Sequence, residues 1–219
     1  MAAGDLSKEM LARVRMRLGD RAGKIWTSDA TIYAFISEGF NVMAHDVVDA
    51  ALYELMKVQS AVLVGAQDEY DLPSDYLRPR IVKYKGLVAV MWPVDELRGL
   101  ELTLYTPAET SPFFYIWDDD LVFEVGTVTQ AAAETYELWY VKTPTAVTTT
   151  VDPELGEAFF QPVEDFAVSR CMESQQEYGM AAVLMGHFIE TCGIINRRYA
   201  GAPAFDGIPN DPRLEVLQQ

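Results

Sequence analysis

The sequence predicts an α+β protein in which amino- and carboxyl-terminal helices form one helical body and an antiparallel β domain is inserted between them. Apolar residues recur at helical spacing near both ends of the 219-residue chain, whereas they alternate with a period of two in its middle. The predicted helical body comprises residues 1–57 and 151–198, and the β domain comprises residues 58–150. A Pro-rich stretch, residues 199–219, is predicted to form an extended docking arm.

The first predicted helix is amphipathic and ends near Gly19. Residues 1–24 carry six basic and three acidic side chains, on a chain whose formal net charge is −16. We call four of these arginines the basic island: Arg13, Arg15, Arg17 and Arg21. They fall mainly on the polar face of the helix, so we expect them to contact an acidic surface on another protein chain.

A second, long helix is predicted to begin after Thr27 or Ser28, either of which can cap it, with Asp29 in the first turn. Its apolar stripe extends to Leu55. The members of the stripe are Ile32, Ile36, Phe40, Met43, Val47, Ala51 and Leu55. The spacing therefore predicts one helix up to about residue 55.

Short extended runs follow, separated by turn residues. The predicted strands are Val58–Val64, Arg80–Tyr84, Leu87–Met91, Leu100–Tyr105, Phe113–Trp117, Leu121–Val125 and Thr135–Val141. Lys85 and Gly86 form one predicted hairpin tip. Asp118, Asp119 and Asp120 form another; their carboxylates suit a hard cation, but the spacing is not that of an EF-hand, so we interpret them as a solvated hairpin tip without a metal.

The predicted sheets are rich in aromatic residues, which can stack on sugars. Residues 136, 138 and 140 share one face of the last strand, and residues 137, 139 and 141 share the other. Both sets are largely apolar, so we favour a sheet covered by helices or by a neighbouring subunit over a carbohydrate-binding platform.

Helical spacing returns after a Thr- and Pro-rich connector, with a break at Gly179 and an end at Arg197 and Arg198. Cys171 and Cys192 are predicted to be free, buried thiols. The docking arm, Tyr199–Gln219, combines three prolines with five apolar anchors. These anchors are Phe205, Ile208, Leu214, Val216 and Leu217.

The sequence lacks the motifs of several enzyme classes, and we predict no catalytic activity, cofactor or metal. It contains no phosphate-binding loop, dinucleotide fingerprint, nucleophile elbow or zincin helix. His45 and His187 are too few for a His-rich metal site. The acidic net charge disfavours nucleic-acid binding, and the apolar run Leu87–Trp92 is far shorter than the ~20 residues that span a bilayer.

Three stretches resemble the head-to-tail adaptor family of tailed bacteriophages. They are MLARVRMRLGD at 10–20, IWTSDA at 25–30 and YDLPSDYLR at 70–78. Weaker similarity continues in order through the Tyr115–Trp117 hairpin, Leu138–Tyr140 and the two closing helices. The resemblance therefore covers nearly the whole chain, although none of its segments is a catalytic motif.

The resemblance implies a structural protein of the virion neck that is assembled in the host cytoplasm. It implies a homo-oligomeric ring of twelve subunits, which binds the portal protein and receives the tail tube or nozzle protein. Genomic DNA would pass through the ring without specific binding, since an acidic channel repels it. The competing hypotheses are a tail terminator or other neck ring protein, a carbohydrate-binding module of a tail fibre and, third, an enzyme.

Overall fold

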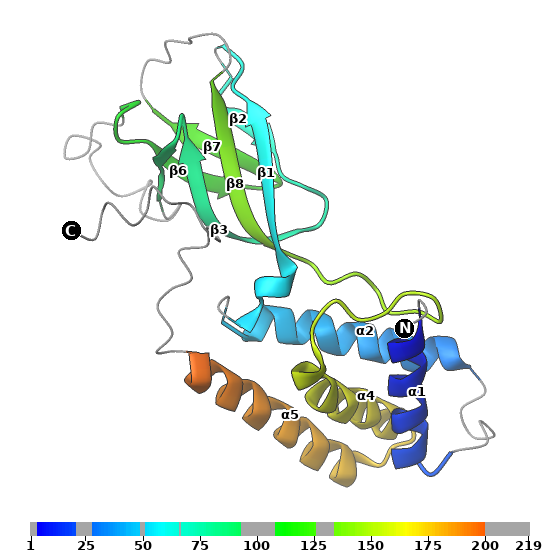
Figure 1. Ribbon diagram of the computed structural model, residues 1–219. Coiled ribbons are helices and arrows are strands. Elements are labelled where there is room, and N and C mark those ends of the chain that lie inside the picture. Colours follow the sequence, from blue (N-terminus) through cyan, green and yellow to red (C-terminus); the bar gives the residue numbers. More distant parts are fainter. Residues whose placement is uncertain are drawn as a thin grey trace. The chain divides into compact units, whose positions relative to one another are not determined.

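Helices and strands occupy two separate compact units of the chain (Figure 1). The helical unit is built from the described parts of Met1–Glu54 and Pro144–Gln219, and the β unit is Leu55–Thr143. The predicted α+β fold class with an inserted β domain is thus confirmed. The structure is a computed structural model, which describes residues 4–20, 28–48, 51–65, 67–92, 108–125 and 134–199.

The helical unit is organised around one buried helix, α4. Its helices are α1 (Asp5–Arg17), α2 (Asp29–Asp46), α4 (Phe160–Ser174) and α5 (Tyr178–Tyr199). Helix α4 contacts α1, α2 and α5, and every residue from Pro162 to Ser169 is buried. The segment of residues 162–169 therefore has no solvent face, which explains why apolar residues occur on all its sides.

Helix α2 ends at Asp46, so the prediction of one helix up to Leu55 is wrong. Val47 is extended, with φ −93° and ψ 143°. Asn196 of α5 stabilises this end: its side-chain amide donates to the carbonyl of Asp46 and its oxygen accepts from the N–H of Val48. The last residues of the predicted stripe are nonetheless buried, in a non-helical segment and a short 3₁₀ helix, η2 (Tyr53–Leu55).

The start of α2 also differs from its predicted cap. Ser28 occupies the N-cap position, but its side chain makes no capping hydrogen bond, and Thr27 lies outside the described residues. The two cysteines are free and buried, as predicted. Burial raises the pKa of the Cys171 thiol to about 12, so this sulfur is not a reactive thiolate near neutral pH.

The β unit is a sandwich of two four-stranded sheets, ordered β1-β8-β3-β4 and β2-β7-β6-β5. Among the described strands, all pairs are antiparallel except β5 with β6. The predicted strand Leu100–Tyr105 lies outside the described residues, and β2 was not predicted. The strands are β1 (Met56–Val62), β2 (Glu69–Asp71), β3 (Tyr76–Tyr84), β4 (Leu87–Val88), β5 (Val90–Met91), β6 (Phe113–Trp117), β7 (Asp120–Glu124) and β8 (Thr135–Lys142).

Aromatic rings fill the space between the two sheets. Tyr136 of β8 lies with its ring centroid 4.8 Å from that of Tyr70, and Tyr84 lies 5.1 Å from Phe123. All four side chains belong to one buried cluster, together with Leu138. These rings stabilise the sandwich by burial and edge contacts, so they are not a platform for a ligand.

Gly39 allows α2 and α4 to approach closely, because a Cβ atom there would lie 3.1 Å from the side chains of both Phe166 and Val163. We expect Gly39→Ala to lower the free energy of unfolding by about 1–3 kcal/mol through overpacking. Gly186→Ala in α5 is the matched control, since its Cβ would meet nothing within 4 Å. It should raise the free energy by about 0.5–1 kcal/mol. Chemical denaturation measures both, and equal stability of the two variants would contradict this packing.

Candidate functional site

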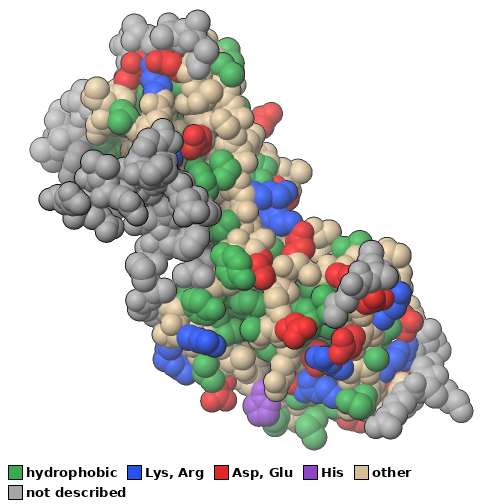
Figure 2. Space-filling model, in the orientation of Figure 1, with side chains coloured by type: hydrophobic (Ala, Val, Ile, Leu, Met, Phe, Trp, Pro, Cys, Tyr) green, Lys and Arg blue, Asp and Glu red, His purple; other side chains and the backbone are tan. Residues whose placement is uncertain are grey.

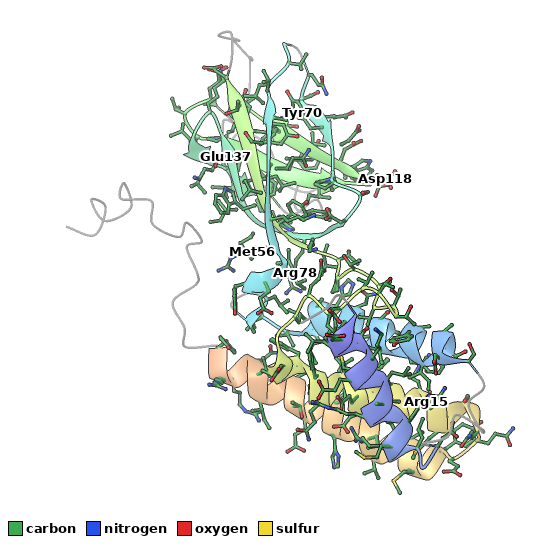
Figure 3. All side chains as sticks on the ribbon, turned by 45° about the vertical axis from the view of Figure 1, so that its right-hand side comes forward. Arg15, Met56, Tyr70, Arg78, Asp118 and Glu137 are labelled. Atoms are coloured by element: carbon green, nitrogen blue, oxygen red, sulfur yellow. The ribbon has the colours of Figure 1, made fainter. Side chains whose placement is uncertain are left out.

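The described residues offer several surfaces for protein contacts. Among the described residues, no three His, Cys, Asp or Glu side chains are grouped so as to hold a metal ion. Asp118 and Asp119 connect β6 to β7, and Figure 3 shows Asp118 at the outer end of that hairpin. The surfaces that can serve such contacts are the charged face of α1, the connector after β8 and the exposed apolar faces.

Three arginines of the basic island have acidic partners within their own chain. Arg17 contacts Asp165, and Arg13 lies 3.5 Å from a carboxylate oxygen of Glu164. Arg15, seen on α1 in Figure 3, pairs with Asp20 at 2.8 Å and also contacts Asp29. Arg21 lies outside the described residues. The sequence could not reveal these partners, since Arg17 and Asp165 are separated by 148 positions.

Two buried acids of α4 explain why α1 is basic. The side chains of Glu164 and Asp165 are each only 7% exposed. Burial raises the pKa of Glu164, and the positive charges of Arg13 and Arg17 oppose that rise. Arg13 and Arg17 therefore have a structural role in this unit, and the inter-subunit contact predicted for the basic island stays a prediction.

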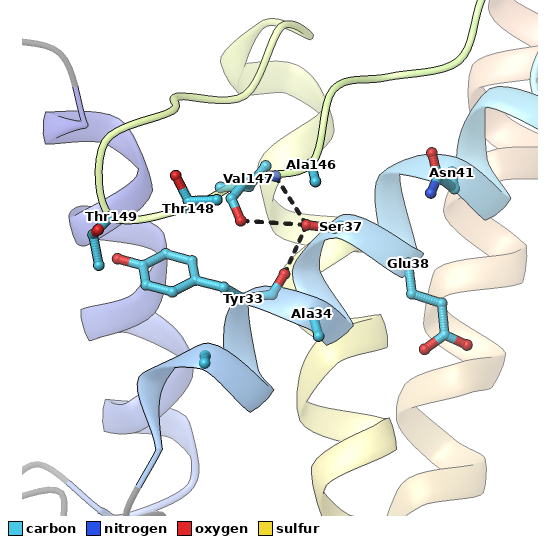
Figure 4. Close-up of a pocket in the computed structure, with 10 residues that line it drawn as sticks. Tyr33, Ala34, Ser37, Glu38, Asn41, Ala146, Val147, Thr148 and Thr149 are labelled. Carbon is cyan, nitrogen blue, oxygen red and sulfur yellow. Dashed lines mark hydrogen bonds between the residues drawn. The ribbon is translucent and has the colours of Figure 1, made fainter. Parts of the chain in front are cut away.

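The connector after β8 attaches to both amino-terminal helices. Asp152 accepts hydrogen bonds of 2.9 Å from the backbone N–H groups of Ser7 and Gly4, and so caps the start of α1. These two hydrogen bonds lower the pKa of Asp152, and the bond from Ser7 has the larger effect. On α2, the Ser37 hydroxyl accepts from the N–H of Val147 at 2.9 Å (Figure 4). Residues 144–150, predicted as part of the β domain, thus belong to the helical unit.

An open groove of about 610 Å³ lies between this connector and α2 (Figure 4). Small side chains, including Ala30, Ala34 and Ala146, form much of its lining. Its acidic residue, Glu38, pairs with Arg170 at 3.1 Å. The groove holds no nucleophile with an adjacent base, so its chemistry is that of a shallow apolar contact surface.

Helix α5 leaves much apolar surface uncovered. Ala181, Phe188 and Cys192 are its buried residues. Figure 2 shows hydrophobic side chains among charged ones on the visible face of the helical unit. By length and composition alone, α5 could also cross a membrane, whereas its buried stripe packs on α4. The apolar residues on its exposed side are Tyr178, Met180, Val183, Ile189 and Ile194.

The β unit also exposes apolar side chains, at its sheet faces and edges. Val62 of β1 is 57% exposed and Val88 of β4 is 64% exposed. Trp117, beside the β6–β7 hairpin tip, is 52% exposed. The five apolar anchors of the docking arm lie outside the described residues.

A protein-family model described as SU10 adaptor protein matches residues 7–203 of the chain. The match begins in α1, includes the whole β unit and extends past the end of α5. A search of curated proteins found no match.

The opposite pKa shifts of two carboxylates predict opposite pH effects. The lowered pKa of Asp152 means that it stabilises the fold above its unfolded pKa of about 3.9, and that this stability is lost as the pH falls through the folded pKa. Asp152→Asn should therefore be less stable than wild type at pH 7, and the difference should shrink on acidification.

For Glu164→Gln, the raised pKa predicts that wild type gains stability relative to the variant as the pH falls. Thermal unfolding between pH 7 and 3 checks both signs, and two parallel pH profiles would contradict the assignment.

Arg17 and Arg13 both pair with buried acids of α4 but differ in their own exposure, at 29% and 44%, so replacing each one alone separates their contributions. Arg17→Gln should lower the free energy of unfolding by about 1–3 kcal/mol, because Asp165 stays buried without its cation. Arg13→Gln is the matched control and should cost about 0–1 kcal/mol, since that side chain is 44% exposed. Urea denaturation measures both values. A larger effect at Arg13 than at Arg17 would refute this division.

Proposed function

The chain belongs to the SU10 adaptor protein family, and on that premise we propose that it is a ring subunit that joins the portal of a tailed phage to the tail. It is a phage adaptor protein of the virion neck. The observation that carries the proposal is the family match over residues 7–203, which covers the helical unit and the inserted β unit in one alignment. We propose no catalytic activity for it.

The proposed assembly is a homo-oligomeric ring of twelve subunits that continues the portal channel and receives the tail tube or nozzle protein. Subunits of a ring must present apolar surface to neighbours, and both units of this chain have such surface. A formal net charge of −16 suits a channel through which genomic DNA passes without binding, because like charges repel. We place its assembly in the host cytoplasm.

Two segments are proposed to contact the portal or an adjacent adaptor. The docking arm begins where α5 ends, at Tyr199, and its three prolines reduce the entropy lost when it binds. The basic island is the second segment. Arg13 is the member of the island whose side chain is most exposed in the described structure, at 44%, and it can reach an acidic neighbour at the least structural cost.

A carbohydrate-binding role loses its main support, since Tyr70, Tyr84, Phe123 and Tyr136 lie inside the sandwich. A tail terminator would also form a ring, but it would bind the tail and not the portal. Binding to the portal therefore distinguishes the proposed adaptor from that alternative.

Removing all residues after Ala200 tests the docking arm. We expect the truncated chain to keep the thermal unfolding of the full chain, and to attach to portal-bearing, tailless heads at least tenfold more weakly. Co-sedimentation with these heads measures attachment. A matched control keeps the length of the arm and replaces its five apolar anchors with serine, which should weaken attachment equally.

Attachment of the truncated chain at full strength would refute the docking role of the arm. A large fall in its melting temperature would show instead that the arm packs on its own subunit. If the full-length chain binds tails and leaves portal-bearing heads unoccupied, the tail-terminator alternative replaces the proposed adaptor.

A further inference from the structure

Helix α5 carries three glycines whose presence no contact with the described residues explains. Gly179, Gly186 and Gly193 are spaced seven residues apart, about two helical turns, so they lie along one stripe of the helix. A Cβ atom at Gly179 or Gly186 would meet nothing within 4 Å, and one at Gly193 would meet only the Arg197 side chain at 3.6 Å. Glycine destabilises a helix relative to alanine, and no contact within the described part of the chain requires it here.

Gly39 differs, because packing within the chain requires a glycine there: the missing side chain makes room for α4. The α5 glycines have no such neighbour, but large apolar residues accompany them. Val183 is 53% exposed, Ile189 is 62% exposed and Ile194 is 49% exposed. A stripe without side chains, flanked by exposed aliphatic residues, is a surface on which another helix can pack at short interaxial distance.

A complementary surface is present on α1 of the same chain. An open groove of about 450 Å³ there is lined by apolar and basic residues together with one acid. The exposed carboxylate of Glu190 on α5 has the opposite charge to Lys8 in this groove. The residues that line the groove are Lys8, Leu11, Ala12, Arg15, Met16 and Asp29.

We propose that α5 of one subunit packs into the α1 groove of a second copy of this chain, with Gly179, Gly186 and Gly193 allowing the close approach. The contact joins two different surfaces, so it is head-to-tail, and repeating it generates a closed ring when the rotation between copies closes. The inference thus rests on the proposed ring and deepens it, because it names the helices that meet between neighbours.

The size of the contact limits its strength. Helix α5 has 22 residues, which corresponds to a length of ~33 Å and, with a width of ~10 Å, a footprint of roughly 330 Å². A stable interface buries about 800 Å² on each partner. The α5 contact alone is therefore too small to hold two free subunits together, and the ring forms where the portal holds many copies side by side.

Gly186→Leu is the direct test, because it fills the stripe at a position where a Cβ atom meets no described residue within 4 Å. We expect an unchanged circular dichroism spectrum and at least a tenfold loss of ring formation on purified portal, measured by electron microscopy. Gln161→Leu, which adds a leucine at an exposed position of α4, is the matched control and should assemble like wild type.

A charge exchange tests the partner helix. Lys8→Glu and Glu190→Lys should each weaken ring formation, and the double variant should restore it if the two residues face each other across neighbouring copies. Failure of the double variant to assemble better than either single variant would overturn the α1 groove as the receiving surface.

The remaining outcomes distinguish a failure of this inference from a failure of the proposed adaptor function. If wild type forms rings on the portal and Gly186→Leu does so equally, the inference is wrong and the adaptor function stands. If wild type forms no ring on the portal, the proposed function fails, and the inference with it. If Gly186→Leu does not fold, the glycine packs within its own chain, which overturns the stripe. Flotation of wild type with phosphatidylglycerol vesicles, undiminished in Gly186→Leu because the leucine adds apolar surface, would instead assign the α5 face to a membrane.

Discussion

The helical unit depends on the burial of α4, which places two carboxylates, Glu164 and Asp165, inside the protein. Charges taken out of water destabilise a fold unless cations and hydrogen-bond donors compensate them. Helix α1 supplies these cations through Arg13 and Arg17. The amino terminus of the chain is thereby fixed to a helix more than 140 positions later, and the rest of the unit follows from this attachment.

The chain must leave this unit and return to it, since the β unit interrupts the helices between Glu54 and Pro144. The returning connector is held by backbone hydrogen bonds to side chains at three places. Asp152 caps α1, Ser37 binds Val147, and Glu54 accepts from the N–H of Gly156 at 2.6 Å. Each bond joins residues on opposite sides of the β unit in sequence. The sandwich can therefore vary its exposed surface without loss of the contacts that close the helical unit.

Periodicity in the sequence predicted the fold class and most elements, because each helix and strand buries one regular set of side chains. It failed at the end of α2, where Val47 is buried in an extended conformation and Leu55 is buried in the 3₁₀ helix η2. It also missed β2, whose three residues include two acids. The partners of the basic island depend on tertiary contacts that no local pattern reports. The exposed apolar side of α5 could have been detected in the sequence, since apolar residues and glycines occur on all sides of that helix. A search for one buried apolar stripe overlooks a second, exposed one.

The family match and these surfaces together describe an adaptor protein with exposed surface for contacts with other proteins. The most direct measurement is electron microscopy of the purified chain mixed with the portal of its own phage. The account predicts a ring of adaptor subunits stacked on each portal, with a central opening continuous with the portal channel. Portals that remain bare beside monomeric protein, at concentrations far above those in an infected cell, would contradict it.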